Sequence, residues 1–102
     1  MDLIEIDRLI AEKVMGFEVT KDGERVQDGK RFGIPSYSEK IEHAWLVAEK
    51  LGDEYGVCIS NQGGWGCLIY DLDTETSYTA QGQVPLAICL AALKAVGVEV
   101  EE

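Results

Sequence analysis

The fold is decided by residues 57–80, which read VCISNQGGWGCLIYDLDTETSYTA. Three short runs in this stretch are rich in β-branched, aromatic and cysteine side chains, and such runs are typical of strands. They are Val57–Ser60, Gly66–Asp71 and Thr76–Ala80. The segments between them, Gln62–Gly64 and Asp71–Glu75, are short enough to join antiparallel neighbours. The sequence therefore predicts a three-stranded antiparallel meander.

Helical patterns lie on both sides of this meander. Upstream, apolar residues at three-and-four spacing predict an amphipathic helix that ends at Leu51, with Ser38 as its N-cap and Gly52 as its stop. Its expected inner stripe is Ile41, Ala44, Trp45, Ala48 and Leu51. Downstream, Pro85 opens a helix that Gly97 ends. This last helix is apolar on almost every side, so we expect it to be the most buried one.

The amino-terminal part predicts a further helix and a hairpin. The same spacing marks a helix over Asp2–Met15, ended by Gly16. Residues Phe17–Val26 alternate around an Asp-Gly pair and predict a short hairpin, and Gln27–Pro35 is expected to be a loop. The elements together indicate one α+β domain over residues 1–102, a layered α/β/α sandwich with a mainly antiparallel sheet and three helices. A short acidic tail is expected from about Val98, where Val98–Val100 could form an edge strand.

The charge of the chain limits its partners. Nine Lys and Arg stand against 19 Asp and Glu, a formal net charge of −10. Since Lys and Arg contacts to phosphate supply most nucleic-acid affinity, direct binding of DNA or RNA is disfavoured. Acids near the amino terminus do not suit a signal peptide, and the longest apolar run is too short to cross a membrane. We therefore expect an intracellular protein whose three cysteines, Cys58, Cys67 and Cys89, are reduced and buried.

No catalytic or metal-binding pattern stands out. The one histidine, His43, lies within the second predicted helix, where a structural role is the better interpretation. Phosphate-binding and nucleophile-elbow motifs are absent from the sequence. Asp71, Asp73 and Glu75 alternate, but threonine stands where a calcium loop needs its glycine, so we expect a solvated turn. The sequence predicts no enzyme, no metal site and no cofactor.

The candidate contact residues lie in two loops. Trp65 stands in a glycine-rich hairpin tip next to Asn61, where little local framework is available to bury its ring. Lys30 and Arg31, followed by Phe32, form the one locally basic stretch, and Tyr37 is close to it in sequence. If the two loops meet, Trp65, Tyr37, Lys30, Arg31 and Asn61 could hold a planar or anionic small ligand. The alternative is that Trp65 folds back onto the core.

Several short motifs are familiar as a set. They are Glu12–Gly16, Pro35–Ser38, Ala44-Trp45, Glu49–Leu51, Pro85–Cys89 and Ala91–Leu93. Together they resemble the phage ABA-sandwich domain family, small proteins of phages and prophages, over about residues 10–96. The resemblance implies an α/β/α sandwich and a phage origin. It brings no catalytic residues, because the family's function is uncharacterised.

The leading hypothesis for function is a phage or prophage accessory protein that acts as a non-enzymatic protein-interaction module on an unidentified host or phage protein. A second hypothesis is a binder that sequesters a small, anionic, nucleotide-like ligand against host defence. A divergent enzyme is the third. Two copies of the chain could also pair through the Val98–Val100 edge.

Overall fold

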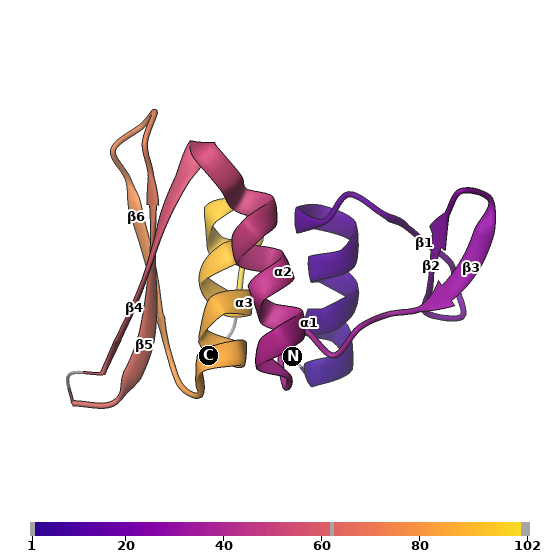
Figure 1. Cartoon of the computed structure of the whole chain (residues 1–102), viewed down its shortest axis with the longest axis horizontal. Coiled ribbons are helices and arrows are strands. Elements are labelled where there is room, and N and C mark those ends of the chain that lie inside the picture. Colours follow the sequence, from indigo (N-terminus) through magenta and orange to yellow (C-terminus); the bar gives the residue numbers. More distant parts are fainter. Residues whose placement is uncertain (1, 62, 101–102) are drawn as a thin grey trace.

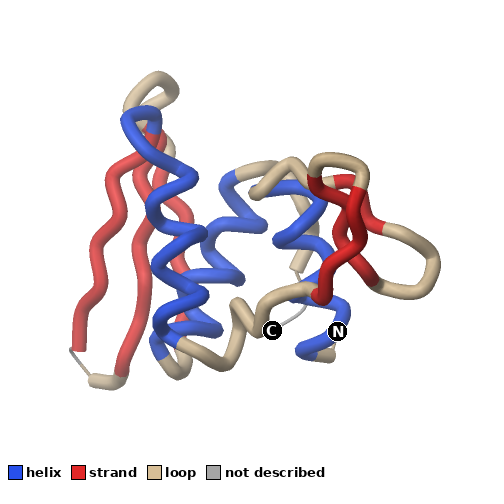
Figure 2. The backbone as a smooth tube through the Cα atoms, turned by 45° about the vertical axis from the view of Figure 1, so that its right-hand side comes forward, coloured by secondary structure: helices blue, strands red, loops and turns tan. Residues whose placement is uncertain are grey.

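The computed structural model describes residues 2–61 and 63–100. Within these residues the chain forms three α-helices and two three-stranded antiparallel sheets, an α+β sandwich. The helices lie between the two sheets (Figures 1 and 2). The helical elements are α1 (Leu3–Leu9), η1 (Ile10–Val14), α2 (Ile41–Leu51), η2 (Gly52–Glu54) and α3 (Val84–Ala95). The strands are β1 (Glu18–Val19), β2 (Glu24–Gln27), β3 (Lys30–Gly33), β4 (Tyr55–Asn61), β5 (Trp65–Asp71) and β6 (Ser77–Gln81).

The predicted meander is confirmed as the sheet β4-β5-β6, with β5 in the centre. Pairing between β4 and β5 runs one to one from Tyr55 opposite Asp71 to Asn61 opposite Trp65. Side chains alternate along β5, so that Cys67 and Ile69 are buried against the helices while Leu68 points to the other face. Gln62, which the sequence places in the connecting turn, lies outside the described residues.

The last helix, α3, is the most buried of the three α-helices in the described chain, as its composition predicts. Pro85 stands in its first turn, where a missing amide breaks no helical hydrogen bond. Every residue from Ala87 to Leu93 is buried. One side of α3 packs across β5 and β6, and other sides pack against α2 and η1.

The first helix is also confirmed, with a change of geometry in its second half. Its backbone widens into a π-helical turn at η1, where the N–H of Met15 donates to the carbonyl of Ile10 at 2.9 Å. Ile10, Ala11 and Val14 are all buried there. These three positions share one face of a helix, and the wider turn keeps all of them against the same core.

The predicted loop over Gln27–Pro35 is wrong for Gln27, which ends β2, and for Lys30–Gly33. Lys30–Gly33 forms β3, which pairs with β2 residue for residue. Asp28 and Gly29 have φ values of 54° and 76° and make the two-residue turn that joins these strands. The strand has no apolar alternation that would predict it, because it begins with the charged pair Lys30-Arg31. The Asp28-Gly29 pair before it is nevertheless typical of a hairpin turn.

The start of the second helix also differs from the prediction. Lys40, and not Ser38, occupies the N-cap position of α2. Ser38 is buried in the preceding turn, where its backbone N–H donates to Asp7 Oδ1 at 2.9 Å. The inner stripe is Ala44, Val47 and Leu51, whereas Trp45 and Ile41 are 48% and 39% exposed. Since successive helical residues are about 100° apart, Trp45 lies on a flank of α2, away from His43 on the other flank.

The carboxy-terminal segment is not the edge strand that the sequence suggested. Residues 98–100 have no regular secondary structure. The N–H of Val98 donates to the carbonyl of Leu93 at 2.9 Å, and Val98 and Val100 pack against the core. This segment therefore continues the hydrophobic core, and the dimer edge predicted there is wrong. Glu101 and Glu102, the end of the predicted tail, lie outside the described residues.

We predict that Tyr37→Ala lowers the free energy of unfolding by about 3–5 kcal/mol. Tyr37 is only 1% exposed and is the largest fully buried side chain among the described residues, so its removal leaves a large cavity. Urea denaturation measures the loss. The matched control is Leu72→Ala, in the exposed β5–β6 turn, which should stay within about 0.5 kcal/mol of the parent. A loss of the same small size for Tyr37→Ala would contradict the burial.

Candidate functional site

The structure does not bring the predicted contact residues together. Trp65 and Asn61 face each other as the last pair of the β4–β5 hairpin, and the Trp65 ring is 50% exposed. Lys30 and Arg31 lie on β3, in the sheet on the far side of the helices (Figure 1). Tyr37 is in the hydrophobic core, so the expectation that it makes ligand contacts is wrong. A pocket shared by the two loops is therefore ruled out by the fold.

The basic part of the small sheet is organised around Arg25. Its guanidinium lies 5.2 Å from the ring centre of Phe17 and 5.3 Å from that of Phe32. Arg25 Nε also donates to the carbonyl of Gly33 at 3.1 Å. These contacts give Arg25 a structural role, because it joins three strands that have little core of their own. Lys30 and Arg31 remain exposed on the neighbouring strand.

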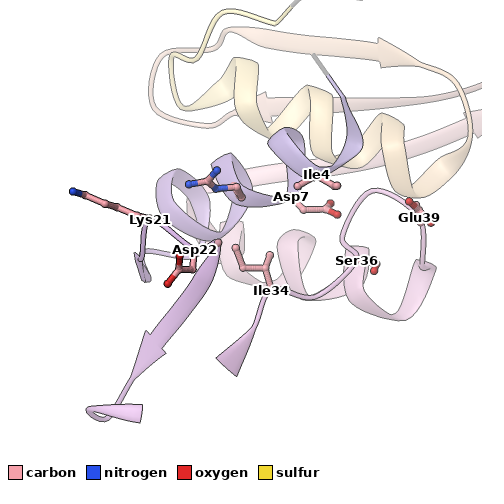
Figure 3. Close-up of a pocket in the computed structure, with 9 residues that line it drawn as sticks. Ile4, Asp7, Lys21, Asp22, Ile34, Ser36 and Glu39 are labelled. Atoms are coloured by element: carbon pink, nitrogen blue, oxygen red, sulfur yellow. The ribbon is translucent and has the colours of Figure 1, made fainter. Parts of the chain in front are cut away.

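A cavity of about 350 Å³ lies between α1, the β1–β2 turn and the segment that leads into α2 (Figure 3). Its lining carries both signs of charge. The lining residues are Ile4, Asp7, Arg8, Lys21, Asp22, Gly23, Ile34, Ser36 and Glu39. None of them is aromatic, so this cavity offers no ring on which a nucleotide base could stack.

Two partly buried hydrogen bonds hold the wall of this cavity. Asp7 Oδ1 accepts from the Ser38 N–H, and His43 Nδ1 accepts from the Ser36 N–H at 3.0 Å. His43 therefore has the structural role that the sequence favours, as an acceptor that fixes the entry to α2. Burial raises the pKa of the Asp7 carboxyl, although the hydrogen bond from the Ser38 backbone N–H opposes the shift. The repulsion from Glu39 raises this pKa further.

The outer face of the β4-β5-β6 sheet is the second candidate surface. In Figure 1 this sheet stands at the left with the helices on one side only, and no described element covers its other face. Strand register and alternation assign nine residues to it. They are Gly56, Cys58, Ser60, Gly66, Leu68, Tyr70, Ser77, Thr79 and Gln81. None of the nine is charged, in a chain with a formal net charge of −10.

The acids near this sheet gather at one end. Asp71, Asp73 and Glu75 belong to the β5–β6 turn, and Glu54 precedes β4 at the same end. Asp71 Oδ1 accepts from the N–H groups of Asp73 and Thr74, at 2.9 and 3.2 Å. Such side-chain to backbone hydrogen bonds are typical of an aspartate that stabilises a turn. The opposite end, the hairpin tip with Asn61 and Trp65, bears no acid in its sequence.

The three cysteines differ in their environment. Cys67 and Cys89 are buried as predicted, whereas Cys58 is exposed on the outer face of the sheet. Burial raises the pKa of the Cys67 thiol to about 11 and raises that of Cys89 even more. The expectation of three buried thiols is therefore wrong for Cys58, which the alternation of β4 turns outward.

Three properties describe the protein as a class: an α+β sandwich, an open neutral sheet face, and a small cavity of mixed charge. Among the described residues, no group of three or more His, Cys, Asp and Glu is placed to hold a metal ion. No helix of the described chain is long and apolar enough to cross a membrane.

The chain belongs to the Phage ABA sandwich domain family, whose model matches residues 8–93. A similar solved structure is the 2.0 Å crystal structure of a phage protein from Bacillus cereus ATCC 14579. The two share 35% sequence identity with a TM-score of 0.86, over 99% of this chain and 93% of that one. None of the curated proteins matches this sequence. The comparisons confirm the phage family and the α+β sandwich that the motifs suggested, and they assign no residue a function.

We predict that one thiol in three reacts with Ellman's reagent in the native protein, because Cys58 alone is exposed. The other two should react only after denaturation. The absorbance of the released thiolate gives the number of reactive thiols in the native protein and in the denatured protein. Cys58→Ser is the control and should leave the native protein unreactive; a rapid reaction in that variant would show that a buried thiol is accessible.

We predict that Asp7→Asn stabilises the protein more at pH 7 than at pH 4. The raised pKa means that ionised Asp7 costs stability in the fold, and that this cost disappears as the pH falls through the folded pKa toward the ordinary value of 3.8. Asn keeps an oxygen that accepts from the Ser38 N–H. Thermal melts of both proteins across this pH range give the difference in Tm, which should shrink with acidity. A difference that grows on acidification would refute the burial of charge at Asp7.

Proposed function

We propose that this phage domain is a non-enzymatic protein-interaction module that acts in the host bacterial cytoplasm. Its recognition surface is the outer face of the β4-β5-β6 sheet. The observation that supports this proposal most is the absence of charge from that open face. The partner is a host or phage protein, bound without a cofactor.

The composition of the face supports a protein partner. The chain has 27% charged residues, so nine average positions would carry about two charges, and these nine carry none. The centres of protein–protein interfaces are similarly depleted of charged residues, while their rims are polar. Leu68 occupies the middle of the central strand and is 37% exposed. Ser, Thr and Gln around it keep the surface wettable without adding charge.

Trp65 is a second exposed feature of this sheet, at the hairpin tip, and the alternation of β5 places its side chain on the side of Cys67 and Ile69, opposite to the outer face. Its backbone is fixed, since the Trp65 carbonyl accepts from the N–H of Gly82 at 3.0 Å, while its ring stays half exposed. A Cβ on the next residue, Gly66, would lie 3.2 Å from the carbonyl oxygen of Ala80, so glycine permits the close approach of β6 here. A rigidly held, half-exposed tryptophan is a typical interface hot spot.

The acids of the chain favour a partner of complementary charge. The carboxylates at one end of the sheet favour a partner whose own contact surface has an uncharged centre and basic groups at the matching end. The same charge disfavours nucleic acid as a direct partner.

A small ligand at the cavity of Figure 3 is the second candidate function. The pocket places Arg8 and Lys21 near Asp7, Asp22 and Glu39, which suits a small molecule that bears both a negative and a positive group. The nucleotide-like ligand that the sequence suggested is less well supported, because Trp65 and Tyr37 are not part of this lining.

The test compares Leu68→Glu with Leu46→Glu in affinity purification from the bacterial host. Leu68→Glu puts a charge in the neutral face, whereas Leu46→Glu puts the same group on an exposed, apolar position of α2, outside that face and outside the cavity lining. We expect proteins captured by the parent to be lost, by tenfold or more, with Leu68→Glu and retained with Leu46→Glu. Equal capture by the two variants would refute the outer face as the recognition surface.

A further inference from the structure

We propose that β4 pairs antiparallel with β4 of a second copy of the chain, around a two-fold axis at Cys58. The two sheets then form one continuous six-stranded sheet. This inference concerns the edge of the sheet and goes beyond the partner proposed for its outer face. The sequence suggested that two copies pair through residues 98–100, but this segment is not a strand. The proposed contact uses β4 instead, which is an edge strand.

The edge of β4 carries none of the features that usually prevent strand pairing. β4 has seven residues, Tyr55–Asn61, with no charged side chain and no proline among them. Its pairing with β5 is one to one along the whole length, so the strand stays regular. Proteins commonly protect edges with Lys, Pro, bulges or short strands, and a long neutral edge is a template for another strand.

The opposite edge of the same sheet shows the contrast. β6 is shorter, with five residues, and Lys94 reaches it from α3. The Lys94 Nζ donates to the backbone carbonyl of Thr79 at 2.7 Å. One edge of the sheet is therefore blocked by a lysine while the other is left open, which selects β4 as the pairing strand.

The inner side of β4 is also incompletely covered. α3 packs mainly across β5 and β6, so the contact of β4 with the core is less complete. As a result Val57 and Ile59 are only partly buried, although they point to the same side as the buried Cys67 and Ile69. Full antiparallel pairing centred on Cys58 places Val57 opposite Ile59 of the second copy, twice over. Such β-branched cross-strand pairs are favourable.

Charge favours a second copy in this antiparallel orientation. Glu54, at the acidic end of β4, then lies beside the acid-free hairpin tip of the other copy. The two Glu54 residues are eight strand positions apart, roughly 27 Å along the sheet, which is well beyond the Debye length at physiological salt. A parallel arrangement would instead set the acidic ends side by side. The neutral strand itself brings no like charges together, so two chains of −10 meet at the part of each sheet that repels least.

The first test measures association of the purified protein by sedimentation across the micromolar to millimolar range. We expect a concentration-dependent dimer. The central pair places the two Cys58 Cα atoms about 4.5–5.5 Å apart, within the range of disulfides. Mild oxidation with diamide should therefore link two chains. Cys58→Ser should give no linked dimer, because Cys67 and Cys89 are buried.

The second test places charges on the axis. Cys58 is exposed, so charged side chains there are compatible with the folded monomer. Cys58→Lys sets two cations directly opposite each other and should weaken the dimer roughly tenfold, whereas Cys58→Ser should dimerise like the parent. A mixture of Cys58→Lys and Cys58→Asp should restore association as a heterodimer. Circular dichroism confirms that each variant is folded.

The outcomes are distinct. A monomer at every concentration, or a dimer that Cys58→Lys leaves unchanged, overturns the inference. Restoration in the mixed sample supports it, because only pairing of position 58 with itself predicts that result. These experiments use purified protein alone, so failure here leaves the outer-face partner standing, and failure of the capture experiment leaves the dimer standing.

Discussion

The burial of α3 is the constraint on which the rest of the structure depends. A helix with seven consecutive buried residues, Ala87–Leu93, needs apolar neighbours on every side. β5 and β6 supply one side, and α2 and η1 supply others. All the described helices therefore gather on one face of the meander. The opposite face is left without a cover, and the sheet becomes both the support of the core and an exposed surface.

The charge of the chain is distributed in keeping with that arrangement. A protein with 19 acids can place them at turns, helix surfaces and tails, where water solvates them. Asp71 and its neighbours follow this pattern at the end of the sheet, and Asp7 departs from it by holding Ser38 beside the cavity. The outer face of the β4-β5-β6 sheet differs from both the turns and Asp7, because it is accessible to water and still carries no charged side chain. Solubility alone does not explain this distribution, whereas the proposed contact with another protein does.

The sequence predicts the elements better than their assembly. The meander and α3 are readily predicted because apolar runs and Pro85 mark them strongly and locally. β3 is missed because its side chains are polar and its neighbours, such as Arg25, supply the contacts. Trp45 is misplaced because a residue beside the core stripe of a helix fits either the stripe or the flank. The shared pocket of Trp65 and Lys30 fails because sequence does not specify which loops meet, and here the helices separate them.

The open face and the open edge have one structural origin. α3 packs mainly across β5 and β6, so β4, which has a neighbour on one side only, is also only partly buried on its inner side. A charged residue on an edge strand hinders its pairing with another chain. Acids are plentiful elsewhere in this chain. Their absence from all seven positions of β4 is thus more consistent with a strand that receives another backbone than with one kept apart from it.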